Sequence, residues 1–180
     1  MSRISGVRVP RAATPASRIE VGGFSGPVAS EGPAGSSAHA ARYTAPATTN
    51  AGKAAGAHLR NRRYAHSGTA LRDIETLQTR YAKMWIAFQK TRALVFEAAA
   101  RGDAGDPEAL PFLLASKADA GETAIALAGD AMTICGGTAY RENSRLAQLL
   151  RDARASHVMA PTTDLLKTWV GRALLNLPLV

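Results

Sequence analysis

The chain has 180 residues, about the length of one domain, and its 46% hydrophobic content is enough for a globular core. Its net charge of +8 is uneven: residues 1–70 carry nine Lys/Arg and two acids, giving +7, whereas residues 71–180 carry thirteen Lys/Arg and twelve acids, giving +1. This distribution, with dispersed arginines hardly interleaved with aromatic residues, argues against a basic surface for nucleic acid, and no nucleic-acid partner is expected.

Nothing in the sequence supports a metal site, a disulfide or a membrane span. Cys135 is the only cysteine and the four histidines are scattered, so no Cys/His cluster has the spacing of metal ligands. No apolar run reaches the ~18 residues that a membrane-spanning helix needs. The sequence therefore predicts no metal ligand, no membrane partner and a cytoplasmic location.

Residues 1–70 read as an Ala/Gly/Pro/Arg-rich segment without helical or strand periodicity. Their large apolar side chains are sparse, so burial offsets too little chain entropy and disorder is predicted. Residues 1–20 are basic and nearly free of acids, which leaves two interpretations: a disordered or out-of-frame leader, or a transit peptide that would make the protein mitochondrial. Pro10 and Pro15 work against the amphipathic helix of a transit peptide.

Helical periodicity begins near residue 71, where the second predicted domain, residues 71–180, starts. A first helix carries an apolar stripe and ends in the turn cluster 101–107. A second long helix runs to about Ile134 and stops at Gly136-Gly137. Its small residues suit close helix packing. The apolar stripe of the first helix consists of Leu77, Tyr81, Met84, Trp85, Phe88 and Val95. The small residues of the second helix are Ala118, Gly121, Ala124 and Ala128.

Two shorter helices follow. Asn143 or Ser144 can cap the third, and Thr162 can cap the fourth, with Asp164 in its first turn where the helix dipole favours an acid. Four helices joined by short turns predict an all-α fold, an up-down four-helix bundle preceded by the disordered segment. Its expected buried residues include Met84, Trp85, Leu114, Ile125, Leu150, Trp169 and Leu174.

Two segments give the sequence a resemblance to a known family. Residues 131–140, AMTICGGTAY, resemble the acyl-CoA dehydrogenase pattern in which a helix ends in Gln-x-x-Gly-Gly-x-Gly-Tyr/Phe. Residues 150–154, LRDAR, and 160–164, APTTD, resemble that family's Arg-Asp-Ala-Arg/Lys run, followed eight residues after the Asp by Glu-Gly-Thr and a last helix. The resemblance covers about residues 72–180 and implies the family's C-terminal helical domain, without its N-terminal and middle β-domains.

The resemblance implies a flavin cofactor, FAD, near the two segments. In the family, the Gly-Gly loop contacts the FAD of a neighbouring subunit, and the Thr of Glu-Gly-Thr lies close to FAD. Carried over by position, the expected cofactor-binding residues are Gly136, Gly137, Thr162 and Asp164. Glycines allow close backbone approach, and a capped helix N-terminus presents free N–H groups to a pyrophosphate. Alternatively, the glycines only end one helix and Thr162 only caps another.

The sequence also departs from the family pattern. Many members place the base that removes the substrate α-proton at the Glu of Glu-Gly-Thr, and this position is Ala160, which cannot accept a proton. Pro161 stands at the following Gly, and Thr133 and Ala139 replace the Gln and third Gly of the glycine motif. Other branches keep the base on the first helix of this domain, expected before residue 71. The sequence therefore offers no residue for the role of the catalytic base, and no catalytic residue is assigned.

Two functional hypotheses follow. In the first, the chain is the C-terminal domain of an acyl-CoA dehydrogenase-like FAD oxidoreductase, a truncated copy that is inactive alone, with acyl-CoA a substrate only of the full-length parent. In the second, it is a non-catalytic helical assembly module that pairs with itself or with full-length relatives. Both lead us to expect a homo-oligomer, because the family's C-terminal helices form its tetramer core.

Overall fold

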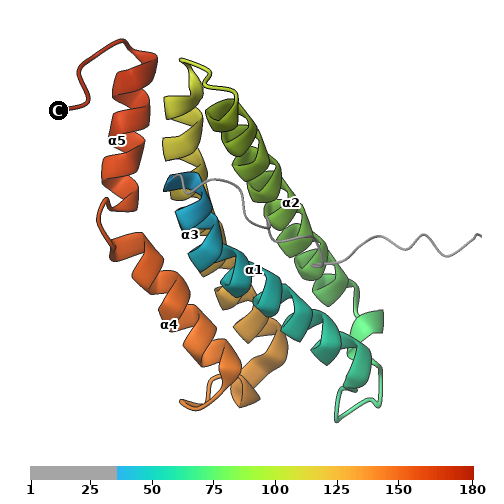
Figure 1. Cartoon of the computed structure of the whole chain (residues 1–180). Helices are drawn as coiled ribbons and strands as arrows, with labels where there is room; N and C mark the ends of the chain where they lie inside the picture. Colours follow the sequence, from blue (N-terminus) through green and yellow to red (C-terminus); the bar gives the residue numbers. More distant parts are fainter. Residues whose placement is uncertain (1–35) are drawn as a thin grey trace, which may run out of the picture.

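The computed structural model describes residues 36–180, with side chains from Thr48 onward (Figure 1). The described part is helical, without a named strand, and its elements are α1 (Ser36–Asn61), η1 (Leu71–Asp73), α2 (Glu75–Asp103), α3 (Ala109–Cys135), η2 (Gly136–Thr138), α4 (Arg145–Val158) and α5 (Thr163–Leu174). The all-α prediction is confirmed. None of these helices is long and apolar enough to cross a membrane.

α3 is the central helix, and α1, α2, α4 and α5 all pack against it. α2 and α3 are antiparallel neighbours, and α4 and α5 follow one another back along α3 (Figure 1). The up-down arrangement is thus present, with its fourth side divided into two helices. The predicted caps are confirmed: Ser144 Oγ accepts from Ala147 N at 3.0 Å, and Thr162 Oγ1 accepts from Leu165 N at 3.4 Å.

The prediction that all of residues 1–70 lack stable structure is wrong for α1. This helix packs against α2, α3 and α4, so the helical domain begins well before residue 71. Its buried positions recur at helical spacing, yet only the last of them is a large aliphatic residue. They are Thr48, Ala51, Gly52, Ala55, Gly56 and Leu59. An amphipathic pattern made of small residues is easily taken for low-complexity sequence. Residues 1–35 lie outside the described part.

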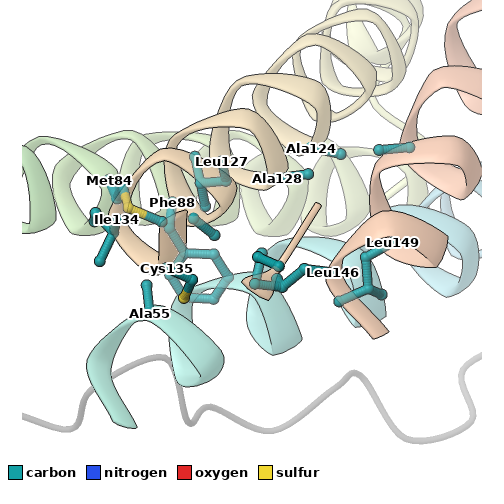
Figure 2. Packing of buried hydrophobic residues seen from close by; sticks show 14 of the residues in the cluster. Ala55, Met84, Phe88, Ala124, Leu127, Ala128, Ile134, Cys135, Leu146 and Leu149 are labelled. Carbon is teal, nitrogen blue, oxygen red and sulfur yellow. The ribbon is translucent and has the colours of Figure 1, made fainter. Parts of the chain in front are cut away.

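The core lies where α1, α2 and α4 meet the C-terminal half of α3. Figure 2 shows Ala55 of α1 next to Ile134 and Cys135, with Leu146 and Leu149 of α4 nearby. Met84 is 1% exposed, as predicted. Trp85, Leu114, Ile125, Leu150 and Trp169 are only partly buried, and Leu174 is 69% exposed, so the expected core was placed too far toward the C-terminus.

Polar contacts fix α2 and α5 against α3. Thr91 donates to Asp119, and Thr91 and Thr123 share a hydrogen bond of 2.8 Å. Because both threonines are buried, this pairing satisfies groups that would otherwise cost free energy. Lys167 of α5 forms an ion pair with Glu122.

We expect Ala55→Leu to destabilise the chain by about 1–3 kcal/mol, because Ala55 is fully buried and three added carbons would force α1 away from its neighbours. The measurement is the free energy of unfolding in urea. Ala93→Leu, at an exposed position of α2, is the matched control. Equal stability of the two variants would show that α1 is not packed on the bundle.

Met84→Ala should cost about 2–5 kcal/mol, because it empties a fully buried site between α2 and the core. Ile86, two residues away on the same helix, is 47% exposed, and Ile86→Ala should cost less than about 1 kcal/mol. Thermal or urea unfolding compares the pair. A smaller loss for Met84→Ala than for Ile86→Ala would contradict the assigned buried face of α2.

Candidate flavin-binding site

The turn after α3 depends on Gly136. Its φ of 67° and ψ of −159° lie in a region that side chains with a Cβ rarely adopt. The following residues form a 3₁₀ turn, in which Ala139 N donates to Gly136 O at 2.9 Å and Tyr140 N donates to Gly137 O at 3.2 Å. Ser144, the cap of α4, donates to Ala139 O and so connects this turn to the next helix.

Gly137 differs from its neighbour because the fold does not require a glycine there. Its φ is not positive, and a Cβ built on it would meet nothing within 4 Å. Gly137 is also exposed, so the backbone at this position faces open space. The turn can therefore be approached closely by another molecule, whereas Gly136 is explained by its backbone conformation alone.

The second candidate segment is the junction of α4 and α5. Ala160 and Thr162 are exposed, and the Ala160–Pro161 peptide bond is cis. Leu165 N and Leu166 N already bond to Thr162, and of the two residues before them Asp164 is exposed whereas Thr163 is only 2% exposed, so a ligand could reach the helix start at Asp164. The Asp164 carboxylate sits in the same turn and offsets part of the positive helix end.

Around this junction lie groups that the sequence did not single out. Lys117 Nζ donates to Pro161 O at 3.5 Å, and burial lowers the pKa of Lys117. A Cβ on Gly121 would lie 3.7 Å from the side-chain oxygens of both Ser156 and Thr163, so α3 passes close to the junction here. Lys117 is the only basic residue of α3, and this isolated charge on an otherwise apolar helix face could have identified it in the sequence as a candidate site residue.

The two candidate segments do not meet within one chain. The junction lies beside Gly121, whereas the glycine turn follows the end of α3 fifteen residues later. At 1.5 Å per residue, the separation along α3 is about 22 Å. Figure 1 shows the turn at one end of the bundle and the α4–α5 junction partway along it. Gly136 and Gly137 thus form one surface, and Thr162 and Asp164 form another.

Neither segment carries a base of the expected kind. Ala160 has no ionisable side chain, and α1, the first helix of the bundle, contains no Asp or Glu between Ser36 and Asn61. The charged side chains placed at the junction are the Asp164 carboxylate in the first turn of α5 and the ammonium of Lys117, which donates to Pro161 O. Lys167 on α5 is paired with Glu122. Its hydrogen bond to Glu122 and the charge of Asp164 raise the pKa of Lys167, so it stays protonated.

No other reactive centre emerges from the described residues. Burial raises the pKa of the Cys135 thiol, which keeps it protonated and unreactive at neutral pH. Within the same part of the chain, no group of three His, Cys, Asp or Glu side chains could hold a metal ion. Among the described residues, the two candidate segments offer backbone donors and exposed turns for binding.

Comparisons with known proteins, by sequence and by structure, give relatives that agree with one another. A probable acyl-CoA dehydrogenase of Mycobacterium leprae is 28% identical over 109 residues, which is 61% of this chain and 28% of that protein. The structure of butyryl-CoA dehydrogenase from Megasphaera elsdenii aligns with a TM-score of 0.71 and 25% identity, covering 78% of this chain and 36% of the other. The FAD complex of PigA aligns with a TM-score of 0.70 and 20% identity, covering 77% and 35%.

The chain therefore spans about a third or less of the proteins it resembles. The family described as "Acyl-CoA dehydrogenase, C-terminal domain" matches residues 38–175, which begin inside α1 and end just after α5. That range includes the whole helical bundle and both candidate segments. With most of its length matched, this chain belongs to the acyl-CoA dehydrogenase family, as its C-terminal helical domain.

Proposed function

We propose that this chain supplies the C-terminal helical part of an acyl-CoA dehydrogenase-like FAD oxidoreductase, and that it does not dehydrogenate acyl-CoA alone. The observation that carries the proposal is that both expected base positions lack a carboxylate, at Ala160 and along α1. α,β-Dehydrogenation requires a base positioned at the α-carbon proton, together with an acceptor for the β-hydride. The matched domain spans only a fraction of its relatives, so substrate walls would come from other domains.

The described residues fit a flavin in part. Gly137 leaves open space at an exposed turn, and Asp164 is an exposed residue in the first turn of α5. Such features suit a pyrophosphate or a ring approaching the backbone, while the Asp164 carboxylate works against an anion. When bound, a flavin would supply the hydride acceptor. We assign binding and orientation to Gly136, Gly137, Thr162 and Asp164.

The separation of the two surfaces supports a shared arrangement between subunits. A distance of about 22 Å along α3 is difficult to bridge from one side of one chain. If the glycine turn serves the flavin of a neighbouring subunit and Thr162 serves its own, the two surfaces need not meet. We therefore propose a homo-oligomer as the flavin-binding state. Acyl-CoA binding belongs to the full-length parent in this proposal.

We expect the purified chain with excess FAD to show no turnover above background with short to long acyl-CoAs and an artificial electron acceptor. Ala160→Glu should also be inactive, because a carboxylate alone does not restore the missing substrate walls. Turnover by the unaltered chain, abolished by Asp164→Asn, would overturn both the inactivity and the account of the missing base.

The flavin surface is tested by titrating FAD into the chain and following quenching of flavin fluorescence. We expect saturable quenching that Gly137→Val weakens at least about tenfold, because the added side chain occupies the open space at the turn. Gly129→Ala, also at a position with nothing within 4 Å, is the control and should bind normally. Neither variant should lower the melting temperature, and Gly129→Ala should raise it slightly because alanine replaces a glycine inside α3. Absence of quenching would refute the flavin assignment.

One observation favours the second function, a non-catalytic assembly module. α5 makes its main contacts with α3 alone, and large apolar side chains at the chain end stay exposed, with Leu174 at 69% and Leu175 at 71%. Such surface suits pairing with itself or with full-length relatives. We also propose a cytoplasmic location. Import of a fluorescent protein fused to residues 1–20 would instead support the mitochondrial alternative.

A further inference from the structure

A groove lies between the C-terminal turns of α1 and the first turns of α2, and we call it the α1–α2 groove (Figure 1). Its volume is about 420 Å³, within the range of about 300–1,000 Å³ that is usual for small-molecule sites. The apolar and aromatic part of its lining consists of Gly56 and Leu59 of α1 and of Tyr81, Ala82 and Trp85 of α2. The groove is therefore large enough for one small ligand, and two of its walls are aromatic.

Gly56 brings two polar groups to the same place in the groove. A Cβ on this buried glycine would overlap the Tyr81 hydroxyl and would lie 3.2 Å from Arg60 Nη1. The phenol and the guanidinium therefore both lie close to the bare backbone of α1. A guanidinium beside aromatic side chains suits a ligand whose ring is flat and whose substituent is an anion.

Arg60 and Arg72 give the groove its positive charge. Among the ion pairs of the described residues, none involves Arg60, and Arg72 pairs only with Asp73 at 3.7 Å, in side chains that are 63% and 61% exposed. Such an exposed pair contributes little free energy, so both guanidiniums remain available to a ligand. Gln78 Nε2 donates to Arg72 O at 2.8 Å and holds the short helix η1 beside the groove.

Trp85 adds an unpaired donor to the lining. Its indole Nε1 is shielded from solvent and has no hydrogen-bond partner. Buried polar groups are almost always paired, so this donor has capacity for an acceptor that the neighbouring residues do not provide. Since Trp85 lines the groove, an oxygen-bearing ligand bound there lies beside the indole.

We propose that the α1–α2 groove binds a small aromatic acid, a molecule of one or two fused rings that carries a carboxylate. The rings pack against Leu59, Tyr81 and Trp85, and the carboxylate lies between Arg60 and Arg72. The planar donors of a guanidinium match the two oxygens of a carboxylate. The inference goes beyond the proposed flavin function, because none of the residues assigned to flavin binding lines this groove.

The first test is calorimetric titration of the chain with 2-naphthoate, a two-ring aromatic carboxylate. We expect saturable binding to one site. The neutral 2-naphthamide should bind at least about tenfold more weakly, and so should 2-naphthoate to the double variant Arg60→Gln with Arg72→Gln, because each change removes the charge pairing. The matched control is Arg151→Gln with Arg154→Gln, two exposed arginines of α4 outside the groove, which should bind normally. Absence of saturable binding, or equal binding of acid and amide, overturns the proposal.

The second test places the ligand in the groove. Ala82→Phe should weaken binding of 2-naphthoate at least about tenfold, because the new ring fills the groove from an exposed position of α2. Ala93→Phe, at another exposed alanine of the same helix, is the control and should bind normally. In nuclear magnetic resonance spectra, 2-naphthoate should shift the indole N–H signal of Trp85 and leave that of Trp169 in place; the Trp169→Phe variant identifies the two signals. Normal binding by Ala82→Phe, or an unshifted Trp85 signal, refutes the site.

Competition with FAD separates this site from the proposed flavin surfaces. We expect the affinity for 2-naphthoate to be the same with and without excess FAD, because the glycine turn and the α4–α5 junction contribute no residue to the groove. Displacement of 2-naphthoate by FAD would show that the groove belongs to the flavin site and would overturn the proposal of a separate ligand.

Discussion

The close approach of α1 to α3 is the constraint on which the rest of the structure depends. The buried positions of both helices are dominated by alanine and glycine, which let the two backbones lie closer than larger side chains would. α1 also contacts α2 and α4, so it holds both sides of the central helix. Larger residues complete the core outside the contact between α1 and α3, where Met84, Leu127 and Leu149 fill the remaining space.

Much of the fold could be predicted from the sequence, and α1 shows why the rest could not. Large apolar residues at helical spacing marked α2 to α5, and Ser144 and Thr162 marked the starts of α4 and α5. α1 carries the same spacing, but its stripe is Ala51, Ala55 and similar small residues, whose hydrophobic signal is weak. Burial of an alanine is decided by the partner helix, and a single sequence does not name that partner.

The candidate site was predictable in its parts and not in its arrangement. The positions of the glycine turn and of the Thr162 cap follow from the helix ends, and both were predicted from local sequence. Their separation depends on how far α4 and α5 fold back along α3, which is set by packing near Gly121. The flavin contacts of Gly136, Gly137, Thr162 and Asp164 remain predictions.

The support of α5 by a single neighbour divides the molecule into regions of unequal local stability. α1 to α4 share one core, whereas α5 contributes Leu166 as its fully buried large side chain and relies on α3. Opening α5 therefore exposes less apolar surface than opening any helix of the core, and it costs less free energy. Amide hydrogens of α5 should exchange by local opening, while those of α3 exchange only on global unfolding. We therefore expect α1 to α4 to unfold as one cooperative unit and α5 to open locally.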